Sequence, residues 1–104
     1  MNLPSGLCVG LDPDISRFPG AYRGKIDALA PFLADIIGAT RPHAAAFKIN
    51  TAFFEQYGRQ GMDALYAVRE AVGSTFCIID AKRGDIGNTS AAYARSLFED
   101  LNAD

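Results

Sequence analysis

The residues best suited to chemistry are three charged side chains that follow one short apolar run. Residues 75–79 are uncharged and β-prone, which is typical of a strand buried on both faces in a parallel sheet. Asp80 and Lys82 are two positions apart, so their side chains are expected on one face of the strand. Asp85 follows in a glycine-containing loop. Such a cluster is costly for stability and indicates chemistry, whereas an ordinary ion pair between Asp80 and Lys82 is the plainer interpretation.

Two further charged residues accompany predicted strands. Lys48 interrupts the apolar run of residues 44–50, so we expect either a partner carboxylate or a side chain that reaches the rim of the sheet. Asp12 follows the apolar run of residues 7–11 and is a candidate site residue, with a turn or helix-cap carboxylate as the alternative. His43 precedes the second run, at the opposite rim, and is interpreted as a loop residue rather than a ligand.

The elements that must position these residues alternate between strands and helices. This alternation indicates right-handed βαβ units and a parallel sheet. Eight such units form a (β/α)8 TIM barrel of about 250 residues. The predicted fold class is therefore α/β, with the N-terminal three βα units of a TIM barrel in one partial domain over residues 1–104. Strands are predicted at about 7–11, 44–50 and 75–81, and helices at about 26–37, 62–72 and 90–101, the first of them ending at Gly38. Pro31 is expected to kink or shorten the first helix, with a start closer to that residue as the alternative.

Other residues are predicted to serve the core. Cys8 and Cys77 lie in apolar runs without metal-binding spacing and are expected to be small buried side chains. Residues 51–61 indicate an aromatic helical turn that Gly58 and Gly61 end. The aromatic side chains expected to point at the sheet are Phe53, Phe54 and Tyr57.

Composition excludes several classes of function. The 104 residues are 49% hydrophobic and 21% charged, which argues against disorder. Net charge is −2 and the basic residues are scattered, so no nucleic-acid or membrane-surface patch is expected. No apolar run is long enough to span a membrane, and no signal peptide is apparent, so a cytoplasmic location is expected.

The segment from Asp80 to Thr89 resembles the signature of the orotidine 5′-phosphate decarboxylase family, D-x-K-x-x-D-I-x-x-T, with every spacing matched. The segments G-L-D-P-D, which contains Asp12, and F-K-I-N, which contains Lys48, also resemble that family and occur in its order. The resemblance implies decarboxylation of orotidine 5′-monophosphate to uridine 5′-monophosphate, the last step of de novo pyrimidine synthesis, with no cofactor and no metal.

The resemblance also implies roles for the matched residues. Lys82 would stabilise the developing carbanion and then supply the proton. Asp80 would hold Lys82 and face the departing carboxylate. Lys48 would complete an alternating charge network and contact the ribose, which Asp12 would also contact.

The remaining matched residues imply a partner. In the family, the residues that match Asp85 and Thr89 reach into the neighbouring subunit's site, which implies a homodimer with shared active sites. Ile86, which lies within the same signature, is expected to contribute to substrate binding. The family's phosphate-binding residues lie on later strands and loops that this sequence does not include, so we expect dependence on a missing C-terminal portion of the barrel.

Two alternatives remain from the sequence. One is a related barrel enzyme that acts on a sugar phosphate and uses the D-x-K-x-x-D carboxylates to hold Mg²⁺. The other is a non-catalytic fragment whose role is assembly, such as the product of a split gene. An open three-stranded parallel sheet exposes two edges and one face, so dependence on a partner or on missing sequence is expected.

Overall fold

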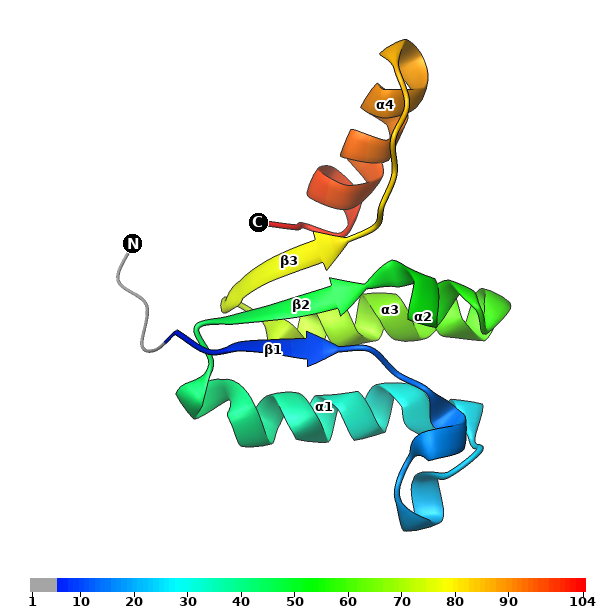
Figure 1. Ribbon diagram of the computed structural model, residues 1–104, viewed down its shortest axis with the longest axis vertical. Coiled ribbons are helices and arrows are strands. Elements are labelled where there is room, and N and C mark those ends of the chain that lie inside the picture. Colours follow the sequence, from blue (N-terminus) through cyan, green and yellow to red (C-terminus); the bar gives the residue numbers. More distant parts are fainter. Residues whose placement is uncertain (1–5) are drawn as a thin grey trace.

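Three parallel strands and the helices that connect them make up the computed structural model, which describes residues 6–104 (Figure 1). The sheet order is β1-β2-β3, and both strand pairs are parallel. The α/β class and the parallel sheet are thereby confirmed, whereas the extent of the domain over residues 1–104 stays a prediction, with its first five residues outside the described part. The strands are β1 (Cys8–Leu11), β2 (Ala46–Asn50) and β3 (Phe76–Asp80); the main helices are α1 (Leu29–Thr40), α2 (Thr51–Glu55), α3 (Gly58–Val72) and α4 (Gly87–Ala94).

The strand register brings the carboxyl ends of the strands to one edge. Gly10 of β1 lies opposite Lys48 of β2, and Asn50 at the end of β2 lies opposite Asp80 at the end of β3. Residues that follow the strands therefore gather at this edge, which is where α/β folds position functional side chains.

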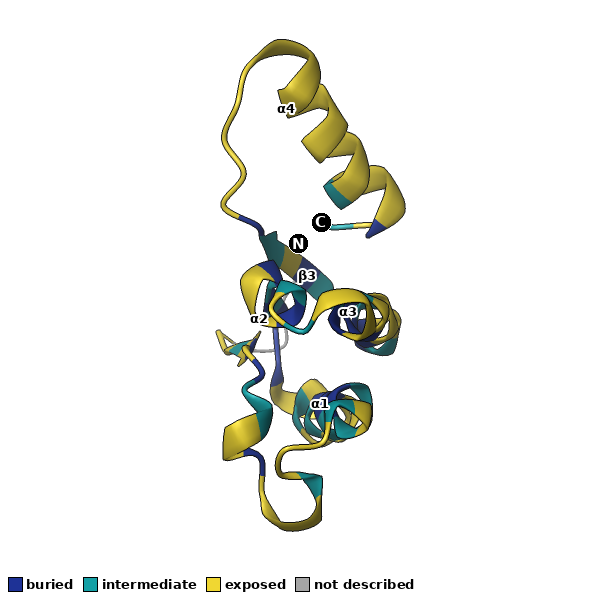
Figure 2. Ribbon diagram, turned by 90° about the vertical axis from the view of Figure 1, so that its right-hand side faces the viewer, coloured by how far each residue is buried: buried dark blue, intermediate teal, exposed yellow. Residues whose placement is uncertain are grey.

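Helices α1 and α3 lie on the same side of the sheet, and the hydrophobic core fills the space between these layers (Figure 2). Alternate strand residues face the helices, and Phe47 and Ile49 of β2 have no exposed surface. The apolar residues of α1 recur every three or four positions, so they form one stripe that belongs to the same core as these strand residues. The most buried helical contributors are Leu29, Leu33 and Ile37 of α1 and Leu65, Val68 and Val72 of α3.

The other face of the sheet is open to solvent. Ile78 of β3, which pairs with Lys48, is 40% exposed, and Cys8 of β1 is exposed as well. The prediction that residues 75–79 are buried on both faces is therefore wrong, as is the predicted burial of Cys8, because among the described residues helices cover one face only. Cys77 points to the helical face and is buried, as predicted.

Helix α1 begins close to Pro31, the alternative that this proline indicated, and ends later than predicted. A single 3-10 turn over Ile26–Ala28 precedes it, and Pro31 then lies in its first turn, where a missing N–H costs no helical hydrogen bond. Gly38 does not end the helix, which continues to Thr40. The predicted terminus was wrong because glycine ends a helix only where the backbone turns left-handed.

The two glycines after α2 have different roles from those predicted. Gly58 has φ +64° and begins α3 rather than ending a helix. Gly61 lies inside α3, where a Cβ would overlap the carbonyl oxygen of Phe54. Gly61 therefore allows α2 and α3 to cross closely. In α2, Phe54 is fully buried as predicted, whereas Phe53 is 36% exposed and does not point into the core.

The last helical segment stands away from the sheet and returns toward β3 (Figure 1). The helix predicted over residues 90–101 begins earlier, at Gly87, and changes from α4 to a π-helical segment over Arg95–Asp100. After it, the Asp104 backbone N–H donates to the Cys77 carbonyl oxygen at 3.0 Å, so the chain comes to lie beside β3.

Candidate active site

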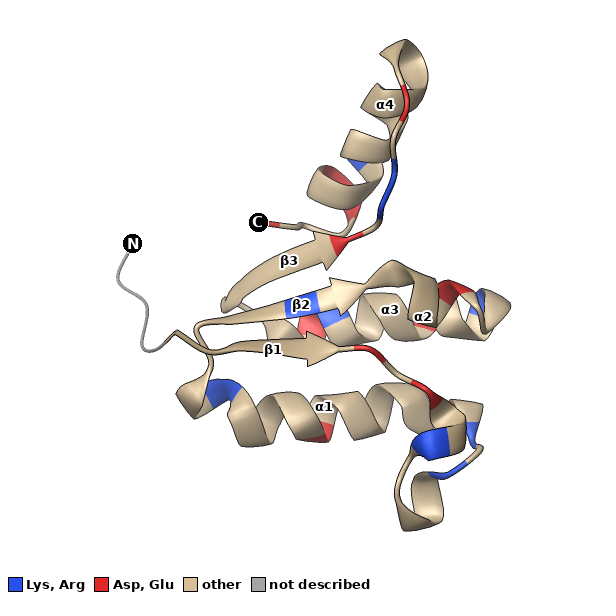
Figure 3. Cartoon of the chain, viewed as in Figure 1, with Lys and Arg blue, Asp and Glu red and all other residues tan. Residues whose placement is uncertain are grey.

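Asp80 is the centre of a three-residue charge cluster at the carboxyl edge of the sheet. The Nζ atom of Lys82 donates to Asp80 Oδ2 at 2.6 Å, and the Nζ atom of Lys48 lies 4.0 Å from the same oxygen. Lys48 comes from the middle of β2 and Asp80 from the end of β3, so the sheet register sets their separation. Figure 3 shows the corresponding basic and acidic segments on these neighbouring strands.

The cluster keeps Asp80 ionised. The hydrogen bond from Lys82 is the main cause that lowers the pKa of the Asp80 carboxyl group, and the positive charges of Lys82 and Lys48 act in the same direction. The Asp80 side chain is 25% exposed, that of Lys48 44% and that of Lys82 71%. The arrangement presents two ammonium groups beside one fixed carboxylate, and Lys82 is accessible to a bound molecule.

The backbone conformation that brings Lys82 to Asp80 differs from the extended strand that the sequence pattern predicts. Strand β3 ends at Asp80, one residue before the predicted end, and Lys82 has φ +50°, in the left-handed region. A non-glycine residue with this conformation is uncommon and is associated with functional sites. The predicted pairing of the two side chains is present, but a turn after the strand brings them together.

Asp12 lies over the open face of β1. Its Oδ2 atom is 3.8 Å from the point where a Cβ on Gly10 would stand, and Gly10 is the register partner of Lys48. The Asp12 carboxylate therefore lies on the same face of the sheet as Lys48. A shallow hollow of about 410 Å³ adjoins it, lined by Asp12, Asp14, Arg17, Phe18, Phe32 and Phe53.

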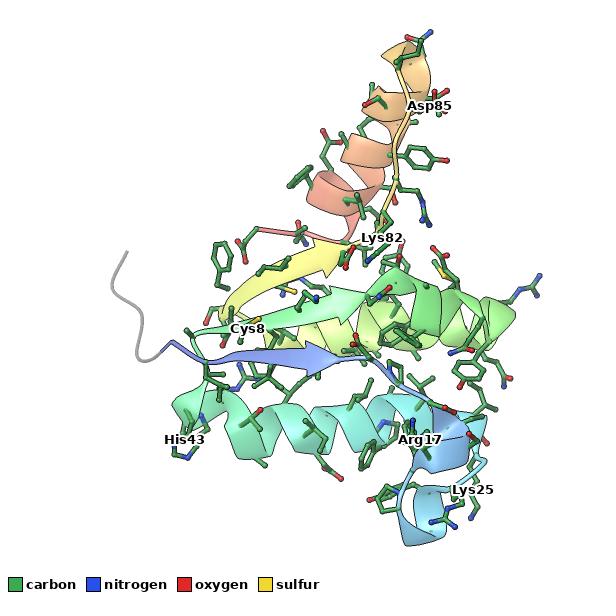
Figure 4. The ribbon with its side chains drawn as sticks, in the orientation of Figure 1. Cys8, Arg17, Lys25, His43, Lys82 and Asp85 are labelled. Carbon is green, nitrogen blue, oxygen red and sulfur yellow. The ribbon has the colours of Figure 1, made fainter. Side chains whose placement is uncertain are left out.

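The structure does not bring Asp85 to the cluster. Figure 4 shows Asp85 near the far end of the loop after β3, away from Lys82. Its Oδ1 atom accepts a hydrogen bond of 2.8 Å from the backbone N–H of Ile86, whose surface is 85% exposed. Thr89 is also exposed, in the first turn of α4. These three predicted site residues thus lie on an exposed loop and helix start.

Two residues with functional geometry were not predicted. Asn50 ends β2 opposite Asp80, and its Oδ1 atom accepts from the backbone N–H of Ala52 at 3.1 Å as the N-cap of α2. Its position at the end of the strand that contains Lys48 could have indicated it as a candidate site residue. Arg83 makes an ion pair with Glu55 across 28 sequence positions, and no local pattern indicates that contact.

Other features bear on what the chain can bind. His43 is exposed in a 3-10 turn before β2, at the rim opposite the charge cluster, as predicted (Figure 4). Within residues 6–104, no group of three or more His, Cys, Asp or Glu side chains is arranged to hold a metal ion. None of the helices in that range is long and apolar enough to cross a membrane.

Residues 5–104 match the sequence profile of the orotidine 5′-phosphate decarboxylase / HUMPS family. The chain is 48% identical to orotidine 5′-phosphate decarboxylase of Flavobacterium johnsoniae, over 96% of this chain and 38% of that protein. It is 46% identical to the enzyme of the same name from Thermomicrobium roseum, over 94% of this chain and 35% of that protein. The chain thus spans less than two fifths of the length of these curated relatives.

The fold is similar to solved structures of the same class. OMP decarboxylase from Leishmania donovani superposes with a TM-score of 0.80 and 41% identity, over 97% of this chain and 37% of that one. UMP synthase from the same organism gives a TM-score of 0.81 and 40% identity, over 97% of this chain and 21% of that one. The three βα units therefore correspond to part of a TIM barrel, as predicted.

Proposed function

Because this chain belongs to the orotidine 5′-phosphate decarboxylase / HUMPS family, we propose that its charge cluster serves the decarboxylation of orotidine 5′-monophosphate to uridine 5′-monophosphate and CO₂. The single observation that carries the proposal is that the ammonium groups of Lys48 and Lys82 both lie at one carboxylate oxygen of Asp80. Asp80 and Lys82 belong to the segment that matches the family signature, and Lys48 belongs to the F-K-I-N segment. The curated relatives named above carry the same activity in their names.

The geometry suits the chemistry. Loss of CO₂ from a pyrimidine ring leaves a carbanion, which a nearby ammonium group stabilises and then protonates. Lys82 offers an exposed ammonium group held at 2.6 Å from Asp80, so it takes this role in the proposal. The ionised Asp80 would disfavour the charged substrate carboxylate beside it, which favours its departure.

Lys48 and Asp12 would contact the nucleotide ribose. Both lie on the open face of the sheet, where a substrate bound across the strand ends would lie. Asn50 is a further candidate because it lies opposite Asp80 in the strand register. Its side-chain oxygen accepts a hydrogen bond from the backbone N–H of Ala52, and this contact fixes the amide group.

We also propose a homodimer with shared sites. The support is the position of Asp85, Ile86 and Thr89 on an exposed segment away from the charge cluster of their own chain. Ile86 exposes 85% of its surface, so its apolar side chain is accessible to a partner subunit. A cytoplasmic location stays a prediction.

The test is a direct assay of the full-length gene product that contains residues 1–104. We expect release of CO₂ and formation of uridine 5′-monophosphate from orotidine 5′-monophosphate, with the same rate in EDTA. A Lys48→Ala, Asp80→Ala double variant is the control and is expected to be inactive. A purified, folded protein without decarboxylation, but with a Mg²⁺-dependent reaction on a sugar phosphate, would instead support the related barrel enzyme.

A further inference from the structure

Arg83 joins three parts of the chain around the proposed reacting lysine. Its guanidinium forms an ion pair with Glu55, the last residue of α2. Its Nη1 atom also donates to the carbonyl oxygen of Ala81 at 2.7 Å, and its Cζ atom lies 5.6 Å from the centre of the Tyr93 ring on α4. One side chain thus contacts a helix from the preceding βα unit, its own loop and the following helix.

The anchor at Glu55 is firmly placed. Helix α2 begins at the residue directly after β2, and its Phe54 side chain is fully buried in the core. Glu55 is therefore fixed relative to Lys48 on β2. The ion pair of Arg83 with Glu55 therefore anchors the loop after β3 to the helix that follows β2, the strand that carries Lys48.

The backbone around Lys82 requires such an anchor. Lys82 lies between Ala81 and Arg83, which the Arg83 side chain links by a hydrogen bond. Ala81, whose carbonyl oxygen accepts the Nη1 hydrogen bond, is largely buried, and Lys82 between it and Arg83 has φ +50°. A left-handed non-glycine residue costs free energy and persists only when its surroundings determine it. The side chain of Lys82 is 71% exposed, so its own packing does little to hold it.

We propose that Arg83 is a positioning residue, which through Glu55 and Tyr93 holds the Ala81–Arg83 backbone so that the Lys82 ammonium stays against Asp80. The expected effect of Arg83 on catalysis rests on the proposed function. Its expected effect on the order of the loop rests on the contacts of Arg83 alone. Arginine is suited to this role because its planar fork presents donors in a fixed geometry to two acceptors, whereas lysine presents one compact ammonium group on a flexible stem.

The consequence is a selective effect on turnover. A displacement of a reacting group by about 1 Å can lower a rate about 100-fold, whereas substrate contacts made elsewhere remain. Arg83→Ala in the full-length gene product is therefore expected to lower kcat about 10- to 100-fold while KM changes less than about threefold. The melting temperature should stay near that of the parent, because the Arg83–Glu55 pair is partly exposed and such pairs contribute little to stability.

Further variants separate positioning from a general loss of structure. Arg83→Lys should recover only part of kcat, since one ammonium group replaces two directed donors. Glu55→Gln should lower kcat in the same direction, and the Arg83→Ala, Glu55→Gln double variant should be no slower than Arg83→Ala alone. Arg59→Ala, at an exposed arginine in the first turn of α3, is the matched control and should behave as the parent.

Two readouts keep the outcomes distinct. Backbone NMR order parameters of residues 81–85 should fall from near 0.85 to below about 0.6 in Arg83→Ala and remain high in Arg59→Ala. If the parent does not decarboxylate orotidine 5′-monophosphate, the proposed function fails and these order parameters alone decide the inference. Unchanged order parameters, a kcat within twofold of the parent, or losses that multiply in the double variant would each overturn it.

Discussion

Lys82 donates a 2.6 Å hydrogen bond to Asp80 from a left-handed backbone position two residues away. The same Asp80 oxygen lies 4.0 Å from Lys48 on the neighbouring strand. One carboxylate thus orders two ammonium groups at the edge of the sheet. The expected consequences for catalysis, ionisation and stability can each be measured.

Replacement of Lys82 by alanine in the full-length gene product should remove nearly all turnover and leave nucleotide binding measurable. The expected loss exceeds the usual general-acid contribution of about 10² to 10⁴, because electrostatic stabilisation of the carbanion is lost with the proton donor. Single-turnover assays and calorimetric binding of uridine 5′-monophosphate measure the two effects. Turnover within tenfold of the parent would contradict the role assigned to Lys82.

Shared sites predict complementation between inactive variants. If Asp85 acts in the partner's site, mixing a Lys82→Ala protein with an Asp85→Ala protein should restore activity, because one site in each hybrid dimer then holds both intact residues. The assay is decarboxylation after subunit exchange, with exchange verified by mass spectrometry. Absence of recovery in verified hybrids would place Asp85 in the site of its own subunit or outside the mechanism.

The ionisation of Asp80 should depend on Lys82. The hydrogen bond from Lys82 lowers the folded-state pKa of Asp80 below the unfolded value of about 3.9. The contact therefore stabilises the fold above that unfolded value and is lost as the pH falls through the lower folded pKa. Carboxyl ¹³C NMR titration should show a higher Asp80 midpoint in Lys82→Met than in the parent. An identical midpoint in the two proteins would mean that Lys82 is not its principal partner in solution.

Gly61 should be intolerant of a side chain, unlike Gly38. A Cβ at Gly61 would overlap the Phe54 carbonyl oxygen, so Gly61→Ala is expected to destabilise the fold by about 1–3 kcal/mol. Gly38 in α1 has no atom within 4 Å of such a Cβ, and Gly38→Ala should stabilise by about 0.5–1 kcal/mol. Chemical denaturation measures both. Equal changes in the two variants would refute the close contact of α2 with α3.

Residues 1–104 expressed alone should bind orotidine 5′-monophosphate weakly and not decarboxylate it. The cluster lies on a sheet face that no described helix covers, with Lys82 71% exposed, so water screens the charges that must act on the substrate. The full-length Flavobacterium johnsoniae relative is the positive control in a CO₂-release assay. Robust turnover by the purified segment would show that the open face suffices for catalysis.

Local sequence patterns were enough to predict the three strands, their parallel direction and the pairing of Asp80 with Lys82. Apolar runs of four or five residues are local properties that the backbone converts into strands. The contact of Asp80 with Lys82 was predicted from their two-residue spacing, but a left-handed turn after the strand makes it. The same local reasoning placed Asp12 and Asp80 at the carboxyl ends of strands and Lys48 within the strand between them. The signature that runs from Asp80 to Thr89 also indicated the family to which the chain belongs.

Tertiary packing determines which surfaces are covered and which distant residues meet. Cys8 and Phe53 occupy apolar segments yet remain exposed, because burial depends on whether another layer lies over that face. Gly61 looks like a helix terminus in the sequence, but it is the place where one helix crosses another. The Arg83–Glu55 ion pair joins residues 28 positions apart, and only the packing of the loop against α2 brings them together. Such contacts depend on how the chain returns on itself, which no local pattern encodes.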